Sequence, residues 1–400
     1  MNSRTGSMIA LVGVVLIGMT GFGVFLPIFP FLALHLGGTA TEATIAMGCY
    51  SLGQLVASPW WGRLSDRVGR KPILIVGLMG GMTSYLILSQ AHTIYDLGAA
   101  RLFGGLMAGN IGAAFASAAD LADDKPRARN MGLLGAAVGF AFICGPALGG
   151  LLIGAGQPDA AAFGKVCLVS AALAGLAALA ALVLYRESLP KEARRAAHEP
   201  RPRRLNMLFT RPVLARFIAV MFLMITAQAM LESTFGLWAK ASLAWGPQQV
   251  GWALAGLGVG AVLLQGGGAG RASRMFGERV ILLVGLGAMI AGFAGMAAAH
   301  SQAVLVAALG VMVIGMGLTT PALNSLIAVQ AQADERGAVM GMSQSASAFG
   351  RVAGPLSAGA IFDTFGHGAP FVTGALLLLG ALFVAQSEPA KATGEDRSPA

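Results

Sequence analysis

Ionisable side chains are scarce inside the long apolar runs of this chain, so those that occur there are the first candidates for chemistry. Of the 18 Asp and Glu residues, only Glu232 lies well inside such a run, in the stretch AQAMLESTFGLW. A charge in the apolar layer of a bilayer costs at least about 2.5 kcal/mol, so it generally lines a cavity or has a partner. We expect Glu232 to take up and release a proton. The alternative is a static partner of an arginine or an amide.

Two arginines share this unusual placement. Arg101 lies one turn into an apolar run, at a depth similar to that of Glu232, and both residues are assigned to proton coupling. The sequence allows Arg101 either to pair with Glu232 or to bond to the first apolar run, at 8–34. Arg351 lies near the middle of a later run, where we expect it to organise its own half of the protein rather than contact a ligand.

A short polar loop at residues 62–74, GRLSDRVGRKPIL, separates two apolar runs, and five of its 13 residues are charged although the whole chain is 11% charged. Its glycines allow close backbone approach, and its acid can cap a helix N-terminus or pair with a base of the other half. Asp120 is placed to pair with Arg67 or Arg70. The alternative is that the bases only set the topology. We expect a cytoplasmic gate formed by Gly62, Asp66, Arg67, Gly69, Arg70, Lys71 and Asp120.

This loop returns in weaker form 208 residues later, as GRASRMFGER at 270–279. An offset of 209 residues also places Arg127, Met131, Gly132, Gly145 and Pro146 on Arg336, Met340, Gly341, Gly354 and Pro355. The pattern predicts two copies of a six-helix unit that point the same way through the membrane, with the binding site in the cleft between them. Because Arg274 stands where the first copy has Asp66, we expect the gate to be asymmetric.

The composition is that of a polytopic membrane protein, with 56% hydrophobic residues and a mean hydropathy of +0.72. The net charge of +9 does not indicate nucleic-acid binding, because the basic residues lie between the apolar runs. Cys49, Cys144 and Cys167 lie inside those runs without metal-ligand spacing. The sequence has no P-loop and no metal constellation, so we expect neither an enzyme nor a cofactor.

Twelve apolar runs approach the roughly 20 residues that a helix needs to cross a bilayer. They lie at 8–34, 43–61, 72–91, 94–119, 130–155, 163–185, 212–239, 247–269, 279–299, 302–328, 337–362 and 367–386. We expect an all-α fold with six-helix bundles at 1–185 and 211–387, a cytoplasmic linker at 186–210 and a disordered cytoplasmic tail at 388–400. Both termini are expected in the cytoplasm, because 23 of the 27 Lys and Arg residues fall on their side.

Almost the whole chain resembles the major facilitator superfamily. Gly62, Leu64, Asp66, Arg67, Gly69, Arg70 and Lys71 resemble its signature loop between helices 2 and 3. Arg101 followed by Gly105 is similar to its helix-4 motif, although Gly104 stands where a Gln is often found. Gly139, Gly145, Pro146, Gly149 and Gly150 resemble the helix-5 motif of the drug:proton antiporter branch. The equivalent part of helix 11 has Arg351, Gly354 and Pro355.

The resemblance implies twelve transmembrane helices in two pseudo-symmetric six-helix bundles, and a monomer in a bacterial-type cytoplasmic membrane. It also implies proton-coupled efflux of amphipathic drug-like or metabolite molecules by alternating access, driven by the proton gradient. The alternative is an importer or facilitator of a sugar, organic acid, siderophore or other small metabolite. Gly18 stands where tetracycline exporters have an acid, and Gly317 and Thr319 lie where related exporters have another, so a metal-chelated tetracycline is a less expected substrate.

The presumed cleft is apolar and aromatic, with isolated amides. This surface suits an amphipathic small molecule held by contact area rather than by an ionic clamp. The candidate substrate-binding residues are Met19, Phe22, Tyr50, Gln54, Asn110, Gln228, Phe235, Trp238 and Asn324.

Overall fold

A computed structural model describes residues 3–122, 127–154, 158–190, 210–264, 269–331 and 335–387. Every regular element within these ranges is a helix, which confirms the all-α prediction. The predicted tail at 388–400 and most of the predicted linker, residues 191–209, lie outside the described ranges. The exact bounds of the linker therefore stay a prediction.

Each half contributes its helices in chain order. The N-terminal half has α1 (Ser3–Phe25), α2 (Phe29–His35), α3 (Ala40–Val68), α4 (Arg70–Leu88), α5 (Ile94–Leu106), α6 (Asn110–Asp120), α7 (Arg127–Ile153) and α8 (Ala160–Val183). The C-terminal half has α11 (Pro212–Leu243), α12 (Pro247–Leu263), α13 (Ala269–Phe276), α14 (Glu278–Ala297), α15 (Gln302–Val329), α16 (Arg336–Phe365) and α17 (Ala369–Gln386). Since α1 and α2 share the first predicted run, α5 and α6 share the fourth, and α13 extends the run of α12, each half has six helical segments.

Nine helical stretches of the described chain are long and apolar enough to cross a membrane. The other three predicted spans correspond to α3, α12 and α16. α12 is only 17 residues long, while α3 and α16 have polar residues such as Gln54 and Arg351 that face an internal cavity. These three helices complete the twelve-helix arrangement although their length or composition differs from that of a lipid-facing span.

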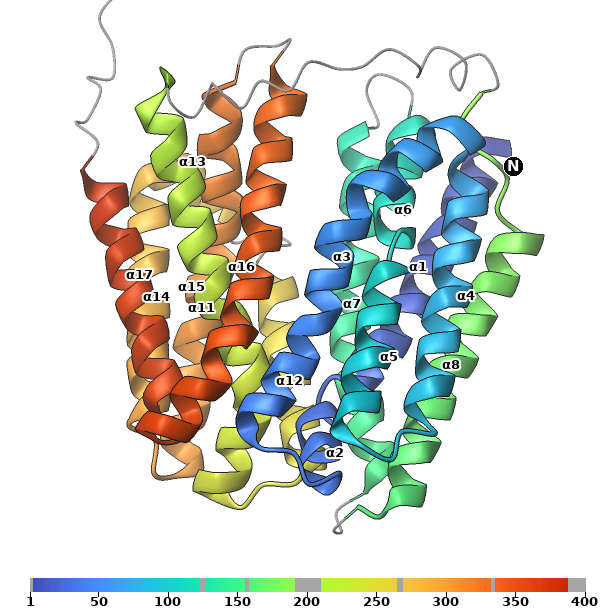
Figure 1. Cartoon of the computed structure of the whole chain (residues 1–400). Coiled ribbons are helices and arrows are strands. Elements are labelled where there is room, and N and C mark those ends of the chain that lie inside the picture. The colour runs from blue at the N-terminus through green and yellow to red at the C-terminus, as the bar shows by residue number, and fades with distance from the viewer. Residues whose placement is uncertain are drawn as a thin grey trace, which may run out of the picture.

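The two halves stand side by side, diverging at one end and meeting at the other (Figure 1). We call the end where α1 begins and α17 ends the terminal end, and the opposite end the distal end. At the distal end α3 packs against α16, and α7 packs against α12. A Cβ added at Gly359 of α16 would lie 2.5 Å from the Thr41 Cα of α3. Only glycine permits this approach, so backbone contacts seal the distal end.

The glycines of the predicted helix-5 motif explain how α7 lies between two neighbours. A Cβ at Gly145 would stand 2.6 Å from the Gly23 Cα of α1, and one at Gly150 would stand 3.0 Å from the Gln248 carbonyl oxygen of α12. α7 therefore packs closely on its own half and on the other half at once, as small residues allow. In α16, Gly354 packs on α11 in the same way.

Candidate functional site

A cavity of about 410 Å³ lies between the two halves. Most of its wall comes from α1, α3, α4, α5 and α6 of the N-terminal half, and α11 and α16 close it from the C-terminal half. Its volume is in the range of pockets that bind drug-sized molecules. We call it the central cavity.

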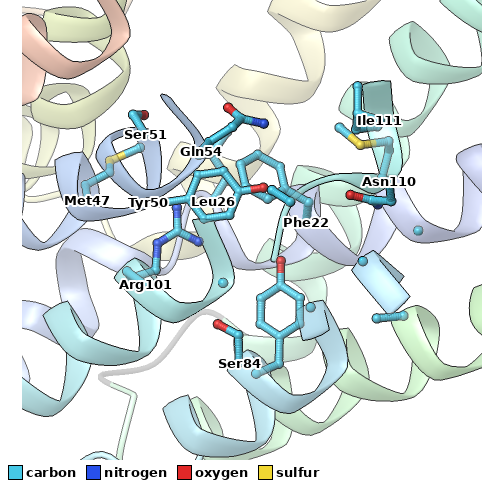
Figure 2. A pocket seen from close by; sticks show the side chains of 18 of the residues that line it. Phe22, Leu26, Met47, Tyr50, Ser51, Gln54, Ser84, Arg101, Asn110 and Ile111 are labelled. Carbon is cyan, nitrogen blue, oxygen red and sulfur yellow. The ribbon is translucent and has the colours of Figure 1, made fainter. Parts of the chain in front are cut away.

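Five of the nine predicted substrate residues line the central cavity, namely Met19, Phe22, Tyr50, Gln54 and Asn110. Figure 2 shows the side chains that line it, with the rings of Phe22 and Tyr50 side by side, 5.5 Å between centroids.

Two further lining residues, Met47 and Ser51, were missed by sequence reasoning. They precede Tyr50 and Gln54 by three residues each, which places all four on one face of α3. That helical spacing was the signal that could have found them.

Of the four other predicted substrate residues, Phe235, Trp238 and Asn324 line neither the central cavity nor the one that adjoins it. Phe235 and Trp238 are 2% exposed and stack on each other with ring centroids 6.3 Å apart. Trp238 also packs edge-on against Phe371 of α17, with centroids 5.5 Å apart. These rings belong to the apolar core of the C-terminal half, where they pack against α17. Asn324 of α15 lines neither the central cavity nor the one beside it.

Gln228 lines a second cavity of about 270 Å³ between α7, α11, α12 and α15, whose wall is mostly Leu, Val and Met. The two cavities share Leu26, Phe142 and Glu232, so they adjoin at the carboxyl of Glu232. The Gln228 amide donates a hydrogen bond to Glu232 Oε1 at 3.3 Å. The side chain of Glu232 is exposed, because it opens onto these cavities.

Arg101 reaches the central cavity through a cage of aromatic rings. Its guanidinium carbon lies 4.4 Å from the ring centroid of Tyr50 and 5.5 to 5.8 Å from those of Phe22, Phe25 and Phe29. Of the two arrangements that the sequence allows, the structure shows the contact with the first apolar run, made through cation–π interactions rather than a hydrogen bond. Within the described chain, Arg101 forms no ion pair with Glu232.

Arg351, which we expected to organise its own half rather than contact a ligand, lines the central cavity together with Glu232. Its side chain is exposed there. Pro355, one turn later on α16, lines the same wall and contacts Gly48 of α3. α16 therefore faces the cavity rather than lying behind it.

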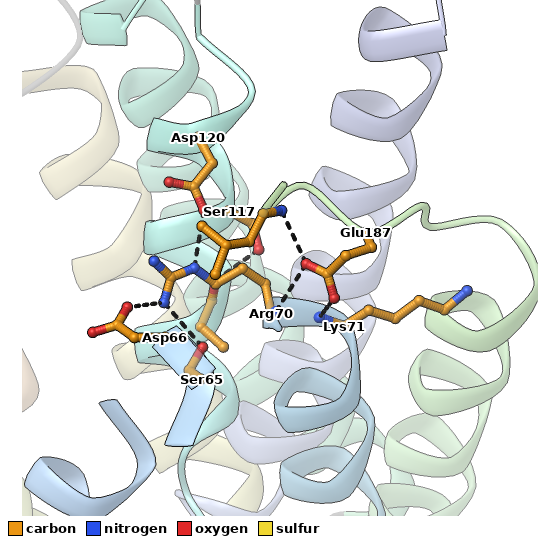
Figure 3. Close-up of polar contacts among 9 residues, drawn as sticks. Ser65, Asp66, Arg70, Lys71, Ser117, Asp120 and Glu187 are labelled. Carbon is orange, nitrogen blue, oxygen red and sulfur yellow. Dashed lines mark hydrogen bonds and ion pairs between the residues drawn. The ribbon is translucent and has the colours of Figure 1, made fainter. Parts of the chain in front are cut away.

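Arg70 organises the predicted gate loop, as Figure 3 shows. Its Nε donates to Asp120 Oδ2 at 2.9 Å, and its Nη1 donates to Asp66 Oδ1 at 2.6 Å and to Ser65 Oγ at 3.1 Å. Of the two partners allowed for Asp120, Arg70 is the one present. Asp66 pairs with Arg70 of its own half in this conformation, and not with any base of the other half among the described residues.

Glu187, rather than Asp66, caps the neighbouring helix. Its carboxylate accepts hydrogen bonds from the backbone N–H groups of Arg70 at 2.9 Å and Lys71 at 3.1 Å, at the start of α4. Sequence reasoning missed Glu187, because it lies more than 100 residues away in a charged segment. Gly69 joins α3 to α4 with φ +112°, a backbone conformation that favours glycine. The Lys71 ammonium donates to the Leu182 carbonyl oxygen at 2.8 Å.

A third cavity, of about 500 Å³, extends from the central cavity toward the terminal end. It shares Gln54 and Arg351 with the central cavity, and Gly62, Asp66 and Arg70 of the gate loop line it farther out. α16 contributes Gln344 and Ser345 from the opposite side. The gate loop thus borders a continuous cavity, while the distal end is sealed.

Two six-helix halves around a central cavity, sealed at one end, define a secondary membrane transporter of the alternating-access type. The chain belongs to the Major Facilitator Superfamily, whose sequence pattern it matches over residues 11–241 and 218–399. It is therefore a multi-pass membrane protein.

Similar proteins include tetracycline and multidrug resistance proteins. The tetracycline resistance protein, class C, of Escherichia coli is 27% identical, with 94% of this chain and 95% of that protein covered. The class B protein of Escherichia coli is 29% identical, with 96% and 94% covered. Multidrug resistance protein 2 of Bacillus subtilis is 26% identical, with 95% and 94% covered.

Solved structures share the fold. The human organic anion transporter MFSD10 (TETRAN) superposes with a TM-score of 0.71 at 24% identity, covering 96% of this chain and 99% of that one. A bacterial homologue of the human lysosomal transporter Spinster, in its inward-facing and occupied conformation, superposes with a TM-score of 0.79 at 14% identity, covering 96% and 97%.

Proposed function

We propose that this protein exports amphipathic drug-like or metabolite molecules in exchange for protons. The observation that supports this most directly is the carboxyl of Glu232, which opens onto a drug-sized cavity with an aromatic and thioether wall. Similarity to tetracycline and multidrug resistance proteins over nearly the whole chain supports the same reading. The proton gradient is the energy source, and no cofactor is required.

We further propose that the terminal end faces the cytoplasm of a bacterial-type inner membrane, because most Lys and Arg residues fall on that side. The conformation described above is then open to the cytoplasm and sealed on the outside. The protein works as a monomer, since each chain holds both halves of its cavity.

In the proposed cycle, the substrate enters the central cavity from the cytoplasm while Glu232 is ionised. The distal contacts then open as the gate loop closes on α16. After the substrate leaves, a proton from the outside neutralises Glu232, the empty protein returns, and the proton leaves to the cytoplasm. Because each crossing carries either the substrate or the proton, the movements are coupled in opposite directions.

Proton flux across liposomes tests this proposal. The purified protein is reconstituted into vesicles that are acidic inside and contain a pH-sensitive dye, and tetracycline, ethidium or 1-naphthylacetate is added outside. Exchange predicts that at least one probe accelerates proton release from the lumen while the probe accumulates. Movement of probe and proton in the same direction would overturn the proposal, and empty liposomes give the background leak.

A further inference from the structure

We propose that the central cavity contains a subsite for a carboxylate, with Arg101 as its anchor, so that the transported molecules include amphipathic organic acids. This inference rests on the proposed function, because it takes the central cavity as the transport site. It starts from a buried cation that has no anionic partner within the described chain.

Arg101 is 5% exposed, and its Nε is fully enclosed without a hydrogen-bond acceptor. No carboxylate, hydroxyl or carbonyl of the described chain bonds to its guanidinium. Its neighbours are instead the four rings of Phe22, Phe25, Phe29 and Tyr50. Ring contacts offset only part of the cost of removing a guanidinium from water. A ligand with a hydrogen-bond acceptor would therefore bind favourably to this group.

The charges of the central cavity favour an anion. Among the described residues that line it, two have guanidinium groups, Arg101 and Arg351, and one has a carboxyl, Glu232. When Glu232 is ionised, it can balance Arg351, which is on the same half, and Arg101 stays uncompensated. When Glu232 is protonated, both arginines are uncompensated. The cavity is therefore positively charged in either state, which attracts acids and disfavours cations.

A carboxylate suits this position better than other polar groups do. The planar guanidinium can donate two parallel hydrogen bonds to a carboxylate, which a neutral amide cannot accept in the same way. Figure 2 shows Arg101 beneath the ring of Tyr50, which lies between Met47 and Phe22 in this view. An acid bound at Arg101 would thus extend its apolar body along rings and thioethers, as an amphipathic molecule requires.

Equilibrium binding of two matched probes tests the subsite. 1-Naphthylacetate and its neutral amide, 1-naphthylacetamide, have the same ring system and nearly the same shape. Calorimetric titration of the full chain in detergent should show the acid binding about tenfold more tightly or better, as expected for a charge-assisted hydrogen bond. Equal affinities for the two probes would overturn the proposal without any variant.

Variants then identify the anchor. Arg101→Gln should remove the preference for the acid and change the affinity of the amide by less than about threefold. Arg101→Lys keeps the charge but not the planar guanidinium, so it should retain part of the preference for the acid. It also allows the test to be made if Arg101→Gln does not fold. Arg216→Gln is the matched control, because Arg216 lies outside the cavity and donates to the Ser387 carbonyl oxygen.

Arg351→Gln separates the two cavity arginines. If the preference for the acid disappears in Arg351→Gln but survives in Arg101→Gln, the anchor is Arg351 and the assignment to Arg101 is overturned. Because these titrations use no gradient, their failure leaves proton exchange untouched. Conversely, an absence of proton exchange in liposomes would remove the proposed function but not the measured preference.

Discussion

Asp363 accepts two hydrogen bonds from Thr41, one from its backbone N–H at 2.9 Å and one from its hydroxyl at 2.6 Å, and so joins α16 to the first turn of α3. The first backbone N–H groups of a helix have no partner within the helix, and its N-terminus attracts negative charge. A carboxylate from one half therefore caps a helix of the other. In the proposed cycle, this cap opens whenever the distal end opens.

Replacing Asp363 by Ala should shift the protein toward the conformation that is open at the distal end. Charge-assisted hydrogen bonds are worth about 1.5 to 3 kcal/mol, enough to change a conformational equilibrium about tenfold or more. Distances between spin labels on the distal ends of α3 and α16, measured by electron paramagnetic resonance, report the shift. Asp363→Asn keeps one acceptor oxygen and should lie between the two. Unchanged distance distributions in Asp363→Ala would show that the cap does not hold the seal.

Gly359→Val should separate the distal ends of α3 and α16, because a side chain there would overlap Thr44 and Thr41. The control is Gly341→Val on the same helix, where an added Cβ meets nothing within 4 Å. The same spin-label distances should lengthen only in the first variant. A closed distal end in Gly359→Val would mean that the two helices accommodate the side chain without separating.

Glu232→Gln should abolish proton coupling while leaving the protein folded, because the amide has nearly the same shape but does not take up the proton. Transport down a substrate gradient should persist, and substrate accumulation driven by the pH gradient should be lost. Glu278→Gln is the control, since Glu278 lies at the terminal end and bonds to Ser325. Gradient-driven accumulation in Glu232→Gln equal to that of the unaltered protein would exclude this residue from coupling.

Trp238→Ala should mainly affect stability, whereas Phe22→Ala should mainly affect which probes bind. Trp238 is buried in the apolar core, so its truncation should lower stability by roughly 3 to 5 kcal/mol and leave the relative affinities for different probes unchanged. Phe22 lines the cavity, so its truncation should change those relative affinities. Thermal unfolding and probe titrations measure the two effects. Altered probe preference in a folded Trp238→Ala protein would restore this residue to the binding site.

Glu187→Ala should destabilise the start of α4 by about 1 kcal/mol, the usual effect of losing a helix cap. Glu187→Gln keeps an acceptor oxygen and should lose less. Hydrogen exchange of the amides of Arg70 and Lys71 reports the change locally. Protection that is unaffected in Glu187→Ala would mean that other acceptors satisfy these two groups.

The sequence predicted most of the architecture. Long apolar runs can only be helices in a bilayer, because each backbone polar group must find its partner within the chain. The repeated Gly-Pro pairs of α7 and α16, at Gly145 and Gly354, indicated two related halves before any contact was known. Glu232 stood out because a charge inside an apolar run is too costly to be incidental.

Only the tertiary structure decided which side chains meet. Arg351 faces the central cavity and Trp238 does not, although both lie on helices that border it, since helix rotation and packing set which face is turned inward. The caps from Glu187 and Asp363 join segments far apart in the chain, and local patterns have no information about such pairs. The sequence by itself determined a duplicated, twelve-helix membrane protein with a carboxyl inside one of its apolar runs. The fold decided that this carboxyl shares its cavity with two arginines and that a carboxylate on one half caps a helix of the other, because both depend on how the two halves dock.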